Sequence, residues 1–220
     1  MTTTAVSTVR PAERRGLADE VADRIREAIF DGAFPPGAPL REVELAANLD
    51  VSRGPVREAL VKLEREGLVQ LRWHRGSSVT TLSAADAEEL YTLRGALERL
   101  AVTRAVAAAS AAELAGLDAI VERMERADSD HALLRLDLEF HDAVYAAAHH
   151  ARLAAAWRAI RSQVYLFLLT RIGAADDYRG HVPAEHRALV GALRAGDPDA
   201  ATELFDAHLR TAYERLAETL

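Results

Sequence analysis

The chain of 220 residues is half hydrophobic, carries a formal net charge of -7 and contains no cysteine. The absence of cysteine excludes disulfides, thiolate metal sites and a cysteine nucleophile, and it fits a reducing cytoplasm. The N-terminus lacks the apolar stretch of a signal peptide, and the apolar run 164–169 is far shorter than the roughly 20 residues of a membrane span. We therefore expect a soluble cytoplasmic protein with no membrane partner.

The negative charge is unevenly distributed along the chain. Residues 1–81 contain 12 basic and 12 acidic residues, whereas residues 82–220 contain 15 basic and 22 acidic residues and account for the whole net charge. Residues 52–76 contain six basic residues and three acidic ones. A local basic segment on an acidic protein is typical of DNA contact through one small surface.

After a flexible tail over residues 1–15, two helices are predicted. An apolar residue recurs every fourth position from Leu17 to Ile29, which indicates a helix with one buried face. An Asp-Gly pair and a Pro-rich segment follow and cannot continue the helix. A second, short helix fits residues 42–48.

A third helix and a hairpin complete this N-terminal region. Ser52 can cap the third helix, Pro55 fits its first turn, and Gly67 ends it. Two short strands are predicted at 69–71 and 78–81, joined by a loop with a basic tip. This order of elements predicts a winged helix-turn-helix domain over residues 16–81.

The remainder of the chain, residues 82–220, is predicted to form six helices. Their expected ranges are 84–109, 110–127, 131–148, 151–173, a helix with Pro183 in its first turn that ends near 196, and a last helix from 198. Ser83 and Ser110 are expected to cap the first two. The connecting loops are short, so neighbouring helices should be antiparallel. The fold class is therefore mainly α: a winged helix-turn-helix followed by an antiparallel bundle of six helices.

Two arginines at the start of the third helix are candidate base-reading residues. Arg53 and Arg57 lie one turn apart on the same face, and arginine can bind guanine O6 and N7 bidentately. Ser52 can contact a backbone phosphate, and Arg75 with Gly76 would place the wing against the minor groove. The alternative for each arginine alone is a solvated helix face, but the turn, the cap and the basic wing together favour DNA.

The segments 51–60 (VSRGPVREAL) and 63–69 (LEREGLV) resemble the recognition-helix signature of the GntR superfamily of bacterial regulators. The resemblance covers about residues 17–81. It implies base contacts by Arg53 and Arg57. Some members carry a further arginine on the second helix, at the position of Val43; this chain instead has Arg41 nearby, which we include as a DNA-binding candidate.

Four side chains of the second region could form a metal site. Asp137 and His141 are four residues apart and share one helix face, while His186 and His208 lie on two later helices. Three imidazoles and one carboxylate projecting into a bundle suit a divalent transition metal, with Zn²⁺ preferred and Ni²⁺, Co²⁺ or Mn²⁺ as alternatives. Each histidine alone could equally be a core residue satisfied by one hydrogen bond.

The same pattern resembles the FCD effector domain of the FadR branch of the GntR proteins, and six helices resemble its shorter, VanR-like subgroup. This resemblance covers about residues 84–218. It implies that Asp137 and the three histidines bind a metal and that a small organic acid completes the metal shell. It also implies that Arg94 binds the acid, although a salt bridge to Glu98 is an equal alternative for that side chain.

We therefore expect a transcriptional regulator, a repressor in preference to an activator, that binds a double-stranded DNA operator as a homodimer, because one recognition helix reads too few bases. A small carboxylate effector at the metal site would modulate operator binding. The alternative is a metal-dependent hydrolase or isomerase that uses the Asp and His residues, with Glu139 as a candidate base. That alternative leaves the N-terminal domain without a role, so we expect no enzymatic activity and no catalytic residue.

Overall fold

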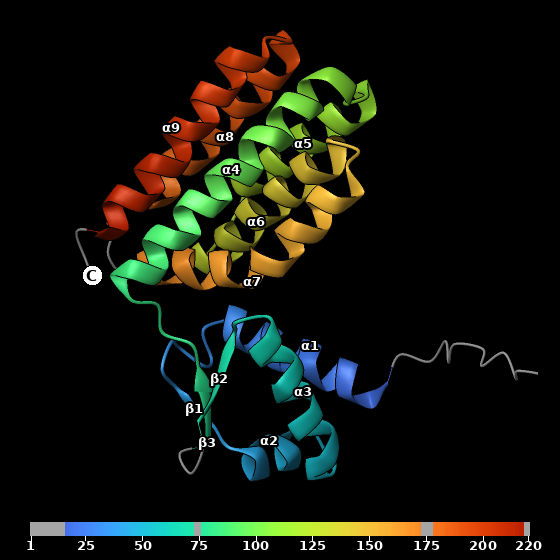
Figure 1. Cartoon of the computed structure of the whole chain (residues 1–220), viewed down its shortest axis with the longest axis vertical. Coiled ribbons are helices and arrows are strands. Elements are labelled where there is room, and N and C mark those ends of the chain that lie inside the picture. Colours follow the sequence, from blue (N-terminus) through green and yellow to red (C-terminus); the bar gives the residue numbers. More distant parts are fainter. Residues whose placement is uncertain (1–15, 73–75, 173–177, 218–220) are drawn as a thin grey trace, which may run out of the picture.

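The computed structural model describes residues 16–72, 76–172 and 178–217 and places a small N-terminal unit beneath a helical bundle (Figure 1). The N-terminal unit comprises α1 (Leu17–Phe30), β1 (Pro39–Leu40), α2 (Glu42–Asn48), α3 (Arg53–Arg65), β2 (Val69–Arg72) and β3 (Gly76–Val79). The predicted tail over residues 1–15 lies outside the described residues.

The three strands form one antiparallel sheet in the order β1-β3-β2. The sequence did not predict β1, a two-residue strand directly after a Pro-rich segment, whose Leu40 pairs with Ser77. The expected position of β3 was also shifted: Arg72 pairs with Gly76, so Gly76 begins the strand instead of lying in the loop. Gly76 has a φ of 76°, which glycine adopts without steric cost.

The caps expected from sequence differ in their chemistry. Ser83 and Ser110 accept hydrogen bonds from the amides of Asp86 and Glu113, as capping boxes do. Ser52 occupies the N-cap position of α3, but its side chain makes no capping hydrogen bond within the described part of the chain. Its hydroxyl is therefore not committed to the helix terminus.

The bundle consists of six helices, and the fold-class prediction is confirmed. They are α4 (Ala84–Ala108), α5 (Ala111–Met124), α6 (Asp130–Ala147), α7 (Ala151–Ile172), α8 (Tyr178–Ala195) and α9 (Pro198–Ala217). The prediction for Pro183 was wrong, because α8 begins at Tyr178 and Pro183 lies inside it. The ring removes one backbone hydrogen bond, while the buried neighbours Val182 and His186 hold this part of the helix in the bundle.

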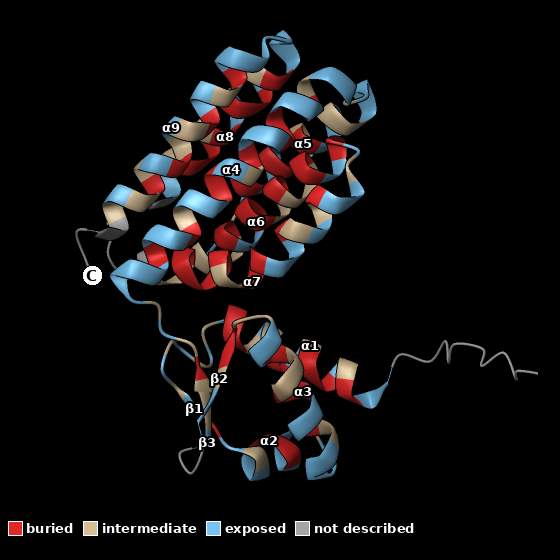
Figure 2. Cartoon of the chain, in the orientation of Figure 1, coloured by how far each residue is buried: buried red, intermediate tan, exposed pale blue. Residues whose placement is uncertain are grey.

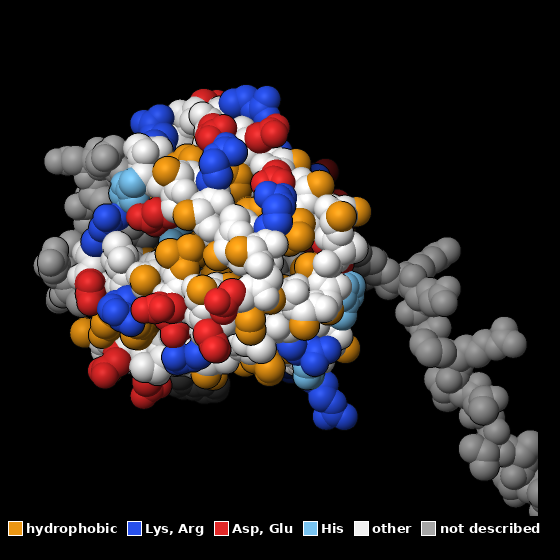
Figure 3. Space-filling view, turned by 90° about the horizontal axis from the view of Figure 1, so that it is seen from above, with side chains coloured by type: hydrophobic (Ala, Val, Ile, Leu, Met, Phe, Trp, Pro, Cys, Tyr) orange, Lys and Arg blue, Asp and Glu red, His pale blue; other side chains and the backbone are white. Residues whose placement is uncertain are grey.

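Each of the six bundle helices contains buried residues, which are coloured along the ribbon in Figure 2. Charged side chains of both signs are interspersed over the end of the bundle far from the N-terminal unit (Figure 3). None of the described helices is long and apolar enough to cross a membrane.

Side chains of helix α7 contact the N-terminal unit. The ring of Tyr165 stacks on Phe30 with centroids 3.7 Å apart, and its hydroxyl donates to the backbone carbonyl of Phe30. Ser162 lies 3.5 Å from the Glu66 carboxylate. A second connection comes from α6, where Arg135 forms an ion pair with Asp31. The end of α1 is therefore held by two helices of the bundle.

Candidate DNA-binding surface and metal-ligand cluster

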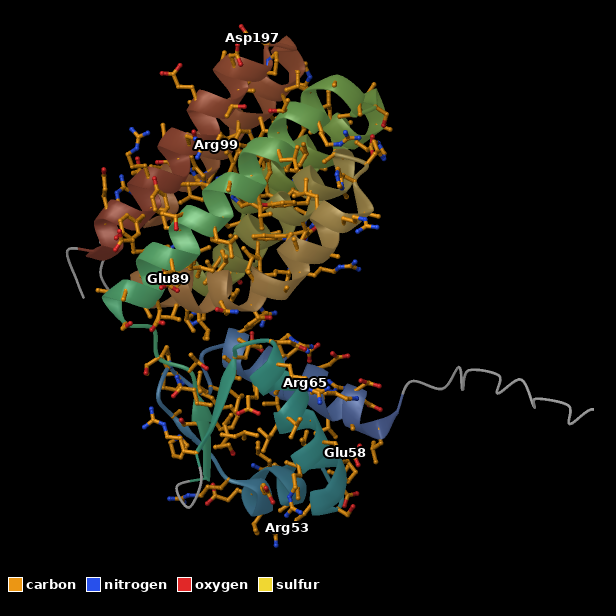
Figure 4. The ribbon with its side chains drawn as sticks, viewed as in Figure 1. Arg53, Glu58, Arg65, Glu89, Arg99 and Asp197 are labelled. Atoms are coloured by element: carbon orange, nitrogen blue, oxygen red, sulfur yellow. The ribbon has the colours of Figure 1, made fainter. Side chains whose placement is uncertain are left out.

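The candidate base-reading arginines, Arg53 and Arg57, lie at the exposed N-terminal end of α3, at the end of the molecule far from the bundle, where Figure 4 labels Arg53. The side chains of Arg53 and Arg57 are 59% and 63% exposed. They border a groove of about 1110 Å³ between α2, α3 and the strands of the wing. Both can therefore reach a ligand that approaches this end of the molecule.

A carboxylate on α2 holds both arginines. Glu42 Oε2 accepts from Arg53 at 3.1 Å and from the terminal nitrogen of Arg57 at 3.0 Å. The hydrogen bond from Arg57 lowers the pKa of Glu42, so this carboxylate is ionised at neutral pH. Glu42 was not predicted as a partner from the sequence, because it lies on a different helix from the arginines and helical periodicity does not extend across the turn between them.

The other DNA-binding candidates are less closely grouped. Arg41 forms an exposed ion pair with Glu44, its neighbour on α2. Ser52 is exposed beside the arginines, and Gly76 borders the same groove. Arg75 lies outside the described residues.

The four predicted metal ligands meet inside the bundle. One ligand atom from each of Asp137, His141, His186 and His208 lies within 4.8 Å of the others. Asp137, His141 and His186 are buried, and the His208 side chain is 8% exposed. Asp137 Oδ1 lies 2.9 Å from His186 Nε2 and 3.4 Å from His141 Nε2. Helices α6, α8 and α9 thus bring together residues far apart in the sequence.

The Nδ1 atom of each histidine is occupied by a protein acceptor. His141 Nδ1 contacts Glu98, His186 Nδ1 lies 2.8 Å from the Val182 carbonyl, and His208 Nδ1 lies 3.1 Å from Glu185. An acceptor at Nδ1 fixes the proton there and leaves the Nε2 lone pair available. Metal-binding histidines show the same arrangement, because the ring nitrogen that does not bind the metal donates to a carboxylate or a backbone carbonyl. Among the described residues, His141 Nε2 is buried without a hydrogen-bond partner. The donor set and this unsatisfied nitrogen fit a divalent transition metal.

Burial and neighbouring charges set the ionisation of this cluster. Burial lowers the pKa of His208 to about 4, so its imidazole is neutral at pH 7 and able to bind a metal. Burial alone would raise the pKa of Glu98, but the contact with the His141 imidazole and the charge of Arg94 outweigh it and hold the pKa well below its usual value. Glu98 is thus a fully buried, ionised carboxylate behind the histidine.

Glu98 joins the metal-ligand cluster to Arg94. Arg94 Nε lies 3.4 Å from Glu98, so the predicted salt bridge is present, and Tyr145 donates to the same carboxylate at 3.2 Å. The guanidinium lies 5.7 Å from the centre of the Trp157 ring, which stacks on Tyr145. From the sequence, Glu98 was expected only as a partner of Arg94, and Glu185 was not predicted. A carboxylate four residues from Arg94 was the only signal.

Glu139, the candidate base of an enzymatic mechanism, lies away from the cluster. Its carboxylate pairs with Arg123 and is 44% exposed. A group committed to a surface ion pair is poorly placed for proton transfer inside the bundle.

Family models match both parts of the chain. Residues 17–79 match "Bacterial regulatory proteins, gntR family", and residues 89–211 match "FCD domain". The chain is 33% identical over 205 residues to a probable D-xylose utilization operon transcriptional repressor of Paenarthrobacter nicotinovorans, covering 92% of this chain and 90% of the relative. It is 30% identical over 203 residues, covering 90% of each protein, to the uncharacterized HTH-type transcriptional regulator YdhC of Bacillus subtilis.

Solved structures share the same architecture. A putative GntR transcriptional regulator from Rhodococcus sp. RHA1 superposes with a TM-score of 0.80 at 28% identity, covering 92% of this chain and 98% of the other. Escherichia coli McbR/YncC, at 23% identity and a TM-score of 0.79, has the same fold over 90% of this chain and 95% of its own. With a winged helix-turn-helix that exposes two arginines and a bundle that matches the FCD domain, this chain belongs to the GntR family of bacterial transcriptional regulators.

Proposed function

We propose that this regulator is a repressor whose binding to a DNA operator is modulated by a small carboxylate bound at a metal site in the helical bundle. One observation supports the metal site: the ligand atoms of four side chains converge inside the bundle, and Nδ1 of each histidine already has a protein acceptor. The four residues are Asp137, His141, His186 and His208. The relative named as a D-xylose operon repressor supports the direction of regulation.

Arg53 and Arg57 are proposed to contact base edges in the major groove, with Ser52 and Arg41 at the phosphates and Gly76 in the wing. Arginines in the first turns of a recognition helix reach base edges when the helix lies in the groove. The double variant Arg53→Ala, Arg57→Ala should lose specific binding at physiological salt. Unchanged affinity for an operator duplex selected by the wild-type protein from a random library would refute the assignment.

The protein is proposed to act as a homodimer, because one recognition helix reads too few bases for a unique site. Two-fold symmetric half-sites in the selected operator and a dimer mass by light scattering would support this arrangement. A non-repeated selected site bound by one chain would contradict it.

Asp137, His141, His186 and His208 are proposed to hold a divalent transition metal, with Zn²⁺ preferred over Ni²⁺, Co²⁺ and Mn²⁺. A bound metal would supply a Lewis acid that attracts a carboxylate oxygen. The variant His141→Ala, His186→Ala should lose metal measured by mass spectrometry on protein purified without a histidine tag. The matched control, His131→Ala, changes a histidine outside the cluster. Equal metal content in both variants would refute the site.

Arg94 is proposed to bind the carboxylate of the effector. Its buried guanidinium has one long contact to Glu98, and its Nη2 nitrogen has no hydrogen-bond partner among the described residues. A metal-dependent enzyme remains the second candidate for this cluster, but the surface ion pair of Glu139 does not favour it.

A further inference from the structure

The guanidinium of Arg94 is buried with less compensation than a charge requires. The residue is 5% exposed, and its contact with Glu98 is shared with His141 and Tyr145. Taking a cation out of water costs several kcal/mol unless its hydrogen-bonding capacity is met. The unsatisfied Nη2 nitrogen therefore marks a position where an anion is favoured.

A small cavity between α4, α7 and α9 has Arg94 among its lining residues. Its volume is about 10 Å³, room for one water molecule. Apart from Arg94, its lining is aliphatic and aromatic: Leu90, Tyr91, Val164, Phe167, Leu209 and Ala212. The only polar group in that lining is the tyrosine hydroxyl.

Two of the residues that line the cavity are linked to the metal-ligand cluster. Leu209 directly follows His208 on α9, and Arg94 is linked through Glu98 to His141. On its other side, half-buried Tyr91 stacks on Tyr213 with ring centroids 4.5 Å apart. A ligand larger than water therefore requires Tyr91 and its neighbours to move, as rotamer changes at binding sites commonly allow.

We infer that this cavity receives the body of the effector, and that the effector is a monocarboxylate with an apolar body, such as an aromatic or branched aliphatic acid. The inference rests on the proposed function of Arg94. The unpartnered Arg94 nitrogen offers a hydrogen bond to one carboxylate, while the apolar walls leave hydroxyl groups of a sugar acid without partners. Each unsatisfied buried hydroxyl carries a desolvation penalty, so polyhydroxylated acids are rejected.

The test is isothermal titration calorimetry of the full-length, metal-loaded protein with four probes. Benzoate and 3-methylbutanoate combine one carboxylate with an apolar body, benzamide lacks the charge, and D-xylonate carries the charge on a hydroxylated body. Benzoate or 3-methylbutanoate should bind at least tenfold more tightly than benzamide and D-xylonate. Failure of both apolar acids to bind, or tighter binding of D-xylonate, overturns the inference.

Two variants locate the binding site. Arg94→Met removes the charge and retains an apolar side chain, and Ala212→Leu fills the cavity from α9; each should weaken binding of the apolar acid at least tenfold. The control Ala207→Leu adds the same bulk at an exposed position of the same helix and should bind as the wild type does. Equal affinity of Ala212→Leu and Ala207→Leu places the acid elsewhere and overturns the inference.

Metal content and operator affinity are measured on the same preparations. If these are intact while no apolar acid binds, the ligand class is wrong and the proposed DNA and metal functions stand. If the wild-type protein retains no metal and binds no selected operator, the proposed function itself fails.

Discussion

Glu42 should determine how selectively the recognition helix reads DNA. Its carboxylate orients Arg53 and Arg57 before DNA arrives, and it also places a negative charge next to the groove that the duplex would occupy. Glu42→Gln preserves the size of the side chain, removes the charge and weakens both ion pairs. We expect this variant to bind non-specific DNA more tightly and to discriminate less between sequences.

The magnitude follows from two effects of opposite sign. Removing one acidic charge near the phosphates acts like adding about one phosphate contact, which steepens the slope of log K against log salt by about 0.9. Between 50 and 200 mM salt this corresponds to an extra loss of about three- to fourfold in affinity. Looser arginines should lower the ratio of specific to non-specific affinity about tenfold, or about 1.4 kcal/mol, within the 1–3 kcal/mol of one bidentate base contact.

The assay is fluorescence anisotropy with a selected operator duplex and a scrambled duplex of the same length, over a range of salt concentrations. Glu44→Gln is the matched control. It removes the same charge from α2, but Glu44 pairs with Arg41 and not with Arg53 or Arg57. An unchanged specificity ratio in Glu42→Gln, or an equal decrease in Glu44→Gln, would refute the positioning role.

Three further outcomes are expected. Glu98→Gln should lower the affinity for Zn²⁺ by about 10–100-fold, because Glu98 orients His141. Competition with a chromophoric chelator measures this affinity, and an effect no larger than that of the surface change Glu139→Gln would contradict the prediction. Tyr165→Phe should leave the operator affinity of the ligand-free protein nearly unchanged but reduce the change in operator affinity caused by the effector, since it deletes the hydroxyl contact between α7 and α1. An undiminished change in anisotropy titrations would show that this contact does not couple effector binding to operator binding. Leu63→Ala should destabilise the folded protein by about 2–5 kcal/mol in urea unfolding, because Leu63 is fully buried beneath α1; a loss below about 1 kcal/mol would show that the core closes around the gap.

The local features of the fold could be predicted from the sequence. Apolar residues at helical spacing, Ser83 and Ser110 before acidic residues, and the signature around Arg53 specify helices through contacts within three or four positions. Pro183 was misplaced because a proline inside a helix and one in the first turn look alike in sequence, and packing decides between them.

Which partner each functional side chain finds was decided by the tertiary structure. Glu98 meets His141 across 43 residues, and Glu185 meets His208 across 23, because these contacts depend on how α4, α8 and α9 pack against their neighbours. The sequence alone supplied the four metal ligands and the two recognition arginines as candidates. Only packing revealed that Glu42 holds both arginines and that Arg94 lies beside an apolar cavity, since such contacts follow from helix packing rather than from periodicity along the chain.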